Sequence, residues 1–345
     1  MTEDWRVRFH RESNAFIAEF VASNPDYTGP EAMDQGWSGH VARGTHRGRP
    51  VVFKVYNMHQ RWTNELFLYR HYADTGFVPA VHDAVEPRLL VMDYVPGRMP
   101  RRDGIDPEVA ANVELRADLG RHLGVAVASL VSTPVPTDDE GRFPPQGFIP
   151  YSPAGWTEDI GASIQRFVDL GWRINNAVRS YGQDPLFEQF LDFMAGQIEQ
   201  IVNDRRVVHH SDFGNLNVLG TRVTGFYDLE SDHIGTESMI LGKMLGAAND
   251  YGLDQDSVLQ GYASAGGNSA LVDHPLRLLA LEQMDPFILR TCRDGRWQGT
   301  ADELRTSEQL GPAAVQRIRE GVQRYSRRVD RRARRELDRW FPGTV

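Results

Sequence analysis

The chain has 345 residues, 41% hydrophobic and 25% charged, which is typical of a globular protein with room for one large or two modest domains. Its single cysteine, Cys292, excludes an internal disulfide and a metal site built from several cysteines. No apolar run approaches the roughly 18–20 residues that span a membrane, and the charged N-terminus has no signal-peptide stretch. These features predict a cytoplasmic protein without a membrane partner.

Charge is spread unevenly along the chain. The formal net charge is −9, and residues 301–345 hold eleven Arg against seven Asp or Glu, giving +4, so residues 1–300 carry −13. An acidic body disfavours non-specific nucleic-acid binding and suits a neutral or cationic ligand. The Arg-rich C-terminal segment has interspersed acids, a pattern typical of a solvated or packing helix; a phosphate- or nucleic-acid-binding arm is the alternative. Nucleic acid is therefore not an expected partner.

The hydrophobic pattern changes from β-rich to helical along the chain. The first part has predicted helices at 12–22 and 61–72 and β-like pieces at 41–43, 51–56 and 89–94. A polar stretch with proline and glycine at 95–104 indicates a boundary or hinge. Helices are then predicted at 107–131, 157–177, 185–203, 238–251, 257–265, 275–292 and 311–341. Between them lie β-like pieces at 206–210 and 218–227 and a proline-rich surface loop at 133–152.

Three features of the β-rich part suit phosphate binding. The turn that contains Gly36, Ser38 and Gly39 lets backbone N–H groups approach a phosphate, although many hairpins have such a turn. Lys54 lies 18 residues beyond Gly36 in an apolar strand, and its ammonium would reach the α- and β-phosphates if it faces a cleft. Glu65, on the following helix, would then be the carboxylate that fixes the lysine. A lysine facing solvent and a solvated helix-surface glutamate are the alternatives.

The strongest signal is the pattern H-x-D-x-x-x-x-N, which runs from His210 to Asn217 between two β-like pieces. Asp212 would accept a hydrogen bond from a substrate hydroxyl and orient it. Asn217 would coordinate Mg²⁺ through its amide oxygen, and His210 is expected to be structural. Asp228 ends an apolar strand 16 residues after Asp212, and its carboxylate would reach a metal that bridges the β- and γ-phosphates. Capping of the next turn is the alternative for Asp228.

These features occur in an order that suits phosphoryl transfer from a magnesium-bound nucleotide, ATP or GTP, to a hydroxyl. With them in place, the sequence resembles the aminoglycoside phosphotransferase family, a branch of the protein-kinase-like fold. That family's catalytic loop reads H-G-D-x-x-x-x-N and is followed by a strand that ends D-W-E or similar, which match 210–217 and 228–230 here. The resemblance covers roughly residues 34–262, and Ser211 replaces the usual glycine.

The resemblance implies an α+β fold with two lobes. A small β-rich N-lobe would span 1–93, a hinge 94–97, and a larger, mainly helical C-lobe 98–345. In the hinge-like stretch 90–97, the resemblance implies that the backbone of Asp93 and Val95 binds the adenine edge and that Met92 lines the pocket. A protein kinase is disfavoured because the residue immediately before Asp212 is not an arginine and because no Ala-Pro-Glu-like segment follows Asp228.

The expected partner is a small molecule that carries a hydroxyl. Candidate residues of its pocket are Glu230, Asp232, His233 and Asp285. Carboxylates suit an aminoglycoside, an amino sugar or another amine, while the family resemblance also allows other antibiotics, sugars, choline-like alcohols or homoserine.

Two other functions remain open from the sequence. A metal-dependent hydrolase could use His209, His210, Asp212 and His233, but that reading leaves Lys54, Glu65 and Asn217 unused. A pseudokinase that binds a nucleotide without turnover is the non-enzymatic alternative.

Overall fold

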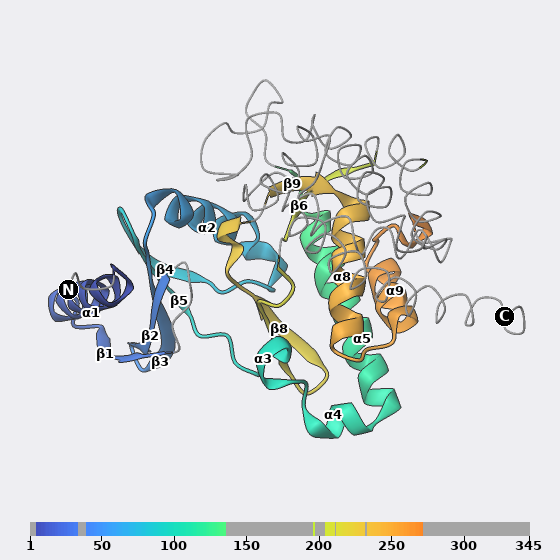
Figure 1. Cartoon of the computed structure of the whole chain (residues 1–345), viewed down its shortest axis with the longest axis horizontal. Coiled ribbons are helices and arrows are strands. Elements are labelled where there is room, and N and C mark those ends of the chain that lie inside the picture. Colours follow the sequence, from blue (N-terminus) through green and yellow to red (C-terminus); the bar gives the residue numbers. More distant parts are fainter. Residues whose placement is uncertain are drawn as a thin grey trace, which may run out of the picture.

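The computed structural model describes residues 5–33, 39–135, 196, 204–210, 212–231 and 233–271. A sheet with helices α1 and α2 forms one part, and helices α3, α4, α5, α8 and α9 with two small sheets form the other (Figure 1). This arrangement confirms the predicted α+β class. The helices predicted at 157–177, 275–292 and 311–341, and residues Gly36 and Ser38, lie outside the described residues, as does the helix predicted at 185–203 apart from residue 196. No described helix is long and apolar enough to cross a bilayer.

The elements of the first part are α1 (Trp5–Ser23), β1 (Tyr27–Ala32), β2 (Gly39–His46), β3 (Arg49–Tyr56), α2 (His59–His71), β4 (Val81–Val85) and β5 (Leu89–Asp93). The elements of the second part are α3 (Pro100–Asp103), α4 (Pro107–Ala111), α5 (Val113–Ser132), β6 (Arg206–His209), β7 (Leu216–Leu219), β8 (Arg222–Phe226), β9 (His233–Thr236), α8 (Glu237–Asp250) and α9 (Gln255–Ser264). Short 3-10 turns lie at Ala73–Thr75, Leu229–Ser231 and Ser269–Leu271.

The sheet of the first part has the strand order β1-β2-β3-β5-β4, and its neighbouring strands are antiparallel. Successive side chains of a strand point to opposite faces. On the central strand β3, Val51, Phe53 and Val55 therefore pack with α1 in one buried cluster. Lys54 and Tyr56 point to the other face, where α2 lies. This alternation turns the lysine away from solvent and toward the second part of the molecule.

The structure adds two edge strands that the hydrophobic pattern does not reveal. Strand β1 contains Gly29, with φ of +33°, and its pairing with β2 shifts register between Thr28 and Glu31. Strand β4 lies at the opposite edge, and none of its side chains is fully buried. An edge strand that buries little surface does not need an alternating apolar pattern, so its sequence signal is weak.

The single helix predicted at 107–131 is wrong, because Asn112 divides it into α4 and α5. The backbone of Asn112 is extended (φ −112°, ψ 121°), and its side-chain oxygen accepts hydrogen bonds from the N–H groups of Glu114 and Leu115. Asparagine is a preferred N-cap because its short side chain replaces the missing acceptor at a helix start. The apolar periodicity continues across this break and hides it.

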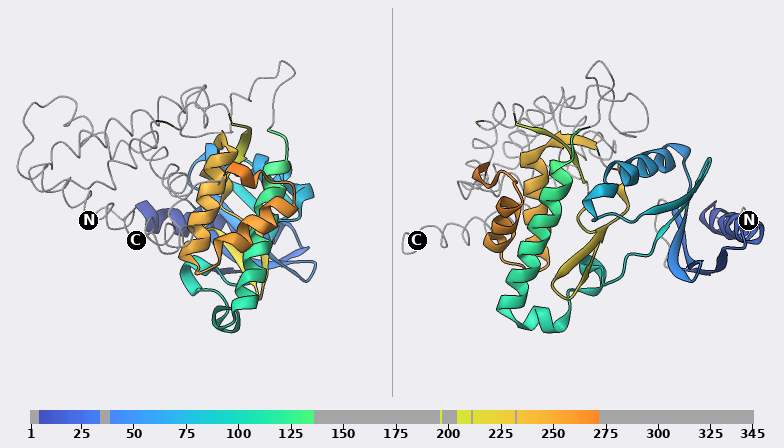
Figure 2. Two further views of the ribbon diagram at one scale, coloured as in Figure 1. Left: turned by 90° about the vertical axis from the view of Figure 1, so that its right-hand side faces the viewer. Right: turned by 180° about the vertical axis from the view of Figure 1, so that it is seen from behind.

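The second part is built around helices α5, α8 and α9, which lie side by side in Figure 2. Helices α5 and α9 approach closely through two glycines. A Cβ at Gly124 would lie 2.0 Å from the carbonyl oxygen of Val258, and a Cβ at Gly261 would lie 1.9 Å from that of Arg121. Only a residue without a side chain fits between these backbones.

We expect Gly124→Ala to lower the free energy of unfolding by about 3 kcal/mol, because the new methyl group forces two helix backbones apart. Gly246→Ala on α8 is the matched control, since a Cβ at Gly246 would meet no neighbouring heavy atom within 4 Å. That control removes a helix-interior glycine without a clash, so it is expected to stabilise by about 0.5–1 kcal/mol. Urea denaturation of both variants measures the difference; equal stabilities would contradict the close approach.

Candidate active site

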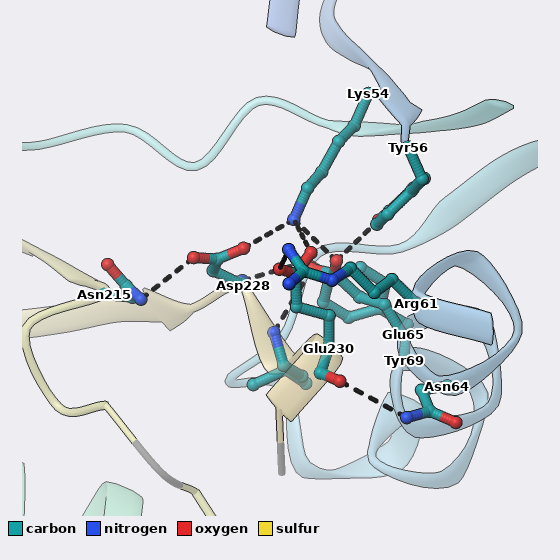
Figure 3. Close-up of polar contacts among 10 residues, drawn as sticks. Lys54, Tyr56, Arg61, Asn64, Glu65, Tyr69, Asn215, Asp228 and Glu230 are labelled. Carbon is teal, nitrogen blue, oxygen red and sulfur yellow. Dashed lines mark hydrogen bonds and ion pairs between the residues drawn. The ribbon is translucent and has the colours of Figure 1, made fainter. Parts of the chain in front are cut away.

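Lys54 lies at the centre of a buried cluster of charges between the sheet and the second part of the molecule (Figure 3). Its ammonium nitrogen is 2.6 Å from Glu65 Oε2, 2.6 Å from Asp228 Oδ1 and 3.4 Å from Glu230 Oε2. Burial alone would lower the pKa of Lys54, but the three carboxylates raise it well above its ordinary value. The lysine therefore keeps its positive charge at the place where the sequence predicts a phosphate-binding cation.

Glu65 is the residue that fixes this lysine. Its side chain is fully buried, and its carboxylate accepts hydrogen bonds from Lys54 Nζ, from the hydroxyl groups of Tyr56 and Tyr69, and from the N–H of Leu229. Burial and the negative charge of Glu65 raise the pKa of both tyrosines, so they remain protonated donors. The structure thus brings the predicted Lys–Glu pair together and adds two tyrosines that the sequence pattern did not indicate.

Asp228 follows β8 and connects the lysine cluster to the loop of the H-x-D motif. Its φ of +63° lies in the left-handed region, which aspartate and asparagine tolerate better than most residues. One carboxylate oxygen contacts Lys54, and the other accepts a hydrogen bond from Asn215 Nδ2 at 3.1 Å. Burial alone would raise the pKa of Asp228, but Lys54 lowers it below its ordinary value, so the carboxylate stays ionised.

The two asparagines of the loop that follows Asp212 have different partners. Asn215 faces Asp228, whereas Asn217 Nδ2 donates to the carbonyl oxygen of Val95 at 2.8 Å and its amide oxygen accepts from the hydroxyl of Tyr227 at 3.1 Å. Asn217 therefore joins the loop to the hinge in this structure, and its metal-binding role stays a prediction. The sequence pattern missed Asn215 because it assigns the amide ligand by its spacing of five from the aspartate.

Asp212 is held at the start of the turn that leads into β7. Its Oδ1 accepts a hydrogen bond from the N–H of Gly214 at 2.9 Å, and its backbone oxygen accepts from the N–H of Asn215 at 2.9 Å. Its side chain is 42% exposed, so the carboxylate is accessible from solvent. The guanidinium of Arg101 contacts both carboxylate oxygens, at 2.9 Å and 3.2 Å. Arg101 was not among the predicted site residues.

His210 lies below this turn and is completely buried. Its ring packs edge-on against Phe213 and Phe226, with centroid distances of 5.2 Å and 5.5 Å. This packing fits the structural role predicted for His210.

Histidines do not gather into a metal site in the described part of the chain. The carboxylates of Glu65, Asp228 and Glu230 form the one group identified there that could hold a metal, and the ammonium of Lys54 already contacts all three. His209 and His233 are opposite each other in the β6–β9 pairing, but the structure describes only their backbone and not their side chains. The hydrolase alternative gains no support from this arrangement.

The predicted hinge connects β5 to the second part of the molecule. The N–H of Asp93 donates to Ala80 at 2.9 Å, and the carbonyl oxygen of Val95 accepts from Asn217. Met92 is 4% exposed and belongs to the cluster that extends from the sheet into the second part. Adenine binding at this segment stays a prediction.

Gly39 is the one residue of the predicted phosphate turn that the structure describes. A Cβ at Gly39 would lie 3.0 Å from the carbonyl oxygen of Val55 and 3.5 Å from Cε of Lys54, so this end of the turn passes directly over the lysine. The glycine leaves room for close approach at this point, as phosphate binding by backbone N–H groups requires.

Glu230 lies within the buried cluster around Lys54 and is not exposed on the surface of a substrate pocket. Its side chain is about 5% exposed, its Oε1 accepts from Arg61 Nη1 at 3.0 Å, and its backbone oxygen accepts from Asn64 at 3.3 Å. The structure therefore places this candidate pocket residue on the lysine side of the site. The side chains of Asp232, His233 and Asp285, the other three candidates, lie outside the described residues.

His40 follows Gly39 and links the sheet to α1. Its ring nitrogens contact Asn14 Oδ1 at 2.8 Å and His10 Nδ1 at 3.1 Å, and the residue is 1% exposed. Burial, and to a smaller extent His10, lowers the pKa of His40 to about 4. The folded protein therefore binds fewer protons here than the unfolded chain between about pH 4 and the ordinary histidine pKa of about 6.5.

Stability is expected to fall as the pH decreases through this window, because the unfolded state takes up the proton that the folded state excludes. His40→Gln removes this contribution. The free energy of unfolding should change less between pH 6.5 and pH 4.5 in the variant than in the natural protein, with a difference of about 1–3 kcal/mol. Chemical denaturation at several pH values measures it, and parallel pH profiles would show that His40 is not kept neutral by the fold.

The comparisons with known proteins agree with this geometry. A model of the phosphotransferase enzyme family matches residues 31–281, which is more than half of the chain. No match was found among curated proteins. A solved structure with a similar fold is the macrolide 2'-phosphotransferase MphH from Brachybacterium faecium (TM-score 0.54, 14% identity, covering 87% of this chain and 100% of that chain).

Two aminoglycoside phosphotransferases also have a similar fold at low sequence identity. A thermostable mutant of APH(4)-Ia, in a ternary complex with AMP-PNP and hygromycin B, has a TM-score of 0.55 at 15% identity, covering 95% of this chain and 99% of that chain. ADP-bound APH(2'')-Ib has a TM-score of 0.52 at 14% identity, covering 88% and 96%. The predicted family resemblance is confirmed, and the chain belongs to the phosphotransferase enzyme family.

Proposed function

We propose that this protein transfers the γ-phosphate of ATP, or of GTP, to a hydroxyl group of a small molecule. The observation that carries the proposal is the continuous network from Lys54 through Asp228 and Asn215 to Asp212. It joins a buried cation suited to nucleotide phosphates with an accessible carboxylate suited to a hydroxyl. The related folds of APH(4)-Ia and APH(2'')-Ib hold AMP-PNP and ADP, which supports a nucleotide as the donor.

In the proposed reaction, Asp212 accepts a hydrogen bond from the acceptor hydroxyl and orients its oxygen toward the γ-phosphorus. Lys54, fixed by Glu65, supplies positive charge to the nucleotide phosphates. At Gly39, the described end of the predicted glycine turn, the lack of a side chain lets backbone N–H groups approach the same phosphates. The protein positions the reactants and neutralises charge, which is most of what phosphoryl transfer requires.

Three oxygen-bearing side chains of the site have the chemistry that a magnesium ion requires. The carboxylate of Asp228 and the amide oxygens of Asn215 and Asn217 are hard oxygen ligands, which Mg²⁺ prefers. We assign these residues to hold Mg²⁺, which when bound neutralises charge on the β- and γ-phosphates. In this structure Lys54 contacts one carboxylate oxygen of Asp228, and the amide N–H of Asn215 donates to the other.

For the acceptor we propose an antibiotic of the aminoglycoside kind or an amino sugar. The net charge of −13 over residues 1–300 favours a cationic or neutral molecule. The related folds include a macrolide phosphotransferase and a hygromycin B complex. A sugar, a choline-like alcohol or homoserine is the second candidate class, because the same fold supports different acceptors.

The experiment that tests this function couples ADP release to a panel of acceptors, with and without Mg²⁺. The panel contains aminoglycosides, macrolides, amino sugars, simple sugars and amino alcohols, and Asp212→Ala is assayed beside the natural protein. Turnover that needs Mg²⁺, one acceptor and Asp212 supports the proposal. Tight nucleotide binding without turnover on any acceptor favours a nucleotide-binding pseudokinase, and absence of nucleotide binding refutes both.

A further inference from the structure

Arg101 lies directly against the carboxylate that is proposed to accept a hydrogen bond from the acceptor hydroxyl. Its Nη1 is 2.9 Å from Oδ2 and 3.2 Å from Oδ1 of Asp212, although the two residues are 111 positions apart in the chain. Arg101 belongs to α3, which follows the hinge and lies beside the β7–β8 hairpin (Figure 1). The fold therefore brings a cation to Asp212 from a distant segment.

The segment that carries Arg101 is fixed to the catalytic loop by backbone contacts. Arg98 and Val218 exchange two backbone hydrogen bonds, of 2.8 Å and 2.9 Å. Gly97 precedes this bridge with φ of +118°, and a Cβ there would lie 2.4 Å from the carbonyl oxygen of Val218. Val218 is in β7, the strand that follows the turn at Asp212. The two hydrogen bonds between Arg98 and Val218 therefore fix the segment that leads into α3 to the same strand that positions this turn.

Gly214 provides the room that the guanidinium occupies. A Cβ at Gly214 would lie 2.5 Å from Cδ and 2.7 Å from Nη1 of Arg101. The φ of Gly214 is not positive, so its backbone conformation does not require glycine. A side chain at this position of the catalytic loop would displace Arg101 from Asp212.

Arg101 keeps hydrogen-bond donors for a second anion. Its Nε and Nη2 have no acceptor among the residues that the structure describes, and its side chain is 64% exposed. Lys54 and Arg61, in contrast, are paired with buried carboxylates. A guanidinium stays charged and presents its donors in a planar fork that matches phosphoryl oxygens. Arg101 can therefore hold Asp212 and a phosphoryl oxygen at the same time.

We propose that Arg101 binds the transferring phosphoryl group and stabilises its charge, an inference that rests on the proposed function. In that step the acceptor oxygen forms a bond to the γ-phosphorus. The bond from phosphorus to the β–γ bridging oxygen breaks, its electron pair leaves with ADP, and the hydroxyl proton passes to Asp212. The negative charge on the three equatorial oxygens then lies close to the Asp212 carboxylate, and Arg101 offsets their repulsion.

Binding of ADP together with aluminium fluoride, a mimic of the transferring phosphoryl group, tests this role without a known acceptor. Arg101→Gln should weaken binding of ADP–aluminium fluoride by at least ~30-fold and change ADP affinity by less than about twofold. Arg101→Lys should recover part of the loss. Arg102→Gln, the matched control, removes the same charge one position along α3, where the side chain pairs with Asp103, and should leave both affinities unchanged.

Two results would overturn this inference and leave the proposed function standing. One is an equal effect of Arg101→Gln on ADP and on ADP–aluminium fluoride, including no effect on either. The other is faster turnover by Arg101→Gln, which would identify the contact as a clamp on the free Asp212. A natural protein that binds neither ADP nor AMP-PNP would refute the proposed function, and the inference with it.

Discussion

Asp212→Asn is expected to lower kcat by about 10²–10⁴-fold while AMP-PNP affinity changes by less than about twofold. Asparagine has nearly the same shape, so it can still bind a hydroxyl and accept from the N–H of Gly214. It cannot take up the proton that the acceptor releases. The nucleotide affinity should persist because Lys54, Glu65 and Asp228, on the other side of the network, are unchanged. Single-turnover kinetics with the acceptor found in the panel, together with calorimetry of AMP-PNP binding, measure the two quantities.

Asp118→Asn is a suitable control for Asp212→Asn. Asp118 is on α5, its carboxylate is 51% exposed, and it pairs with Arg121 on the same helix. The same change of charge at this position should leave kcat and nucleotide affinity unaltered. If Asp212→Asn kept nearly full kcat, Asp212 would not be the group that receives the proton, and the hydroxyl side of the site would have to be sought elsewhere.

The lysine side of the site was predictable because the sequence encodes it locally. Lys54 interrupts an apolar strand, and the two-residue period of a strand leaves it on the face opposite Phe53. Glu65 is 11 residues further along, on the next helix, so a short connection limits where it can lie. Asp212 and Asp228 were proposed from motif spacing, and the hydrogen bonds of Asp228 to Lys54 and Asn215 connect it with both the lysine and the loop that holds Asp212.

Contacts between distant segments were not predictable in this way. Arg101 and Asp212 are 111 residues apart, and Arg61 and Glu230 are 169 residues apart. Their pairing depends on how the two parts of the molecule meet, which sequence periodicity does not specify. Glu230 is an example. Its position two residues after Asp228 suggested a substrate contact, whereas the fold pairs its carboxylate with Lys54 and Arg61. The sequence also did not predict that Asn215, and not Asn217, contacts Asp228, because motif spacing gives the residue type and not the direction of its amide.

Asp228→Asn is expected to abolish measurable turnover, a loss of at least ~10³-fold, because it removes the charged ligand proposed for magnesium. The fold should tolerate this change. Asparagine accepts the left-handed backbone conformation at this position, and Lys54 keeps its 2.6 Å contact with Glu65. Substitution also removes one of three carboxylates crowded around a single ammonium, so the remaining acids repel each other less.

Mg²⁺-dependent binding of ATP separates loss of metal from loss of fold. In the natural protein, Mg²⁺ should strengthen ATP binding; in Asp228→Asn this increase should vanish while the thermal midpoint of unfolding stays close to that of the natural protein. Asn215→Ala and Asn217→Ala form a matched pair in the same measurement. Both asparagines are assigned as ligands, so each substitution should reduce the Mg²⁺ effect; an asparagine whose loss leaves the effect intact is not a ligand. An undiminished Mg²⁺ effect in Asp228→Asn would remove Asp228 from the metal site, and Lys54 would then be its principal partner in the working enzyme as it is in this structure.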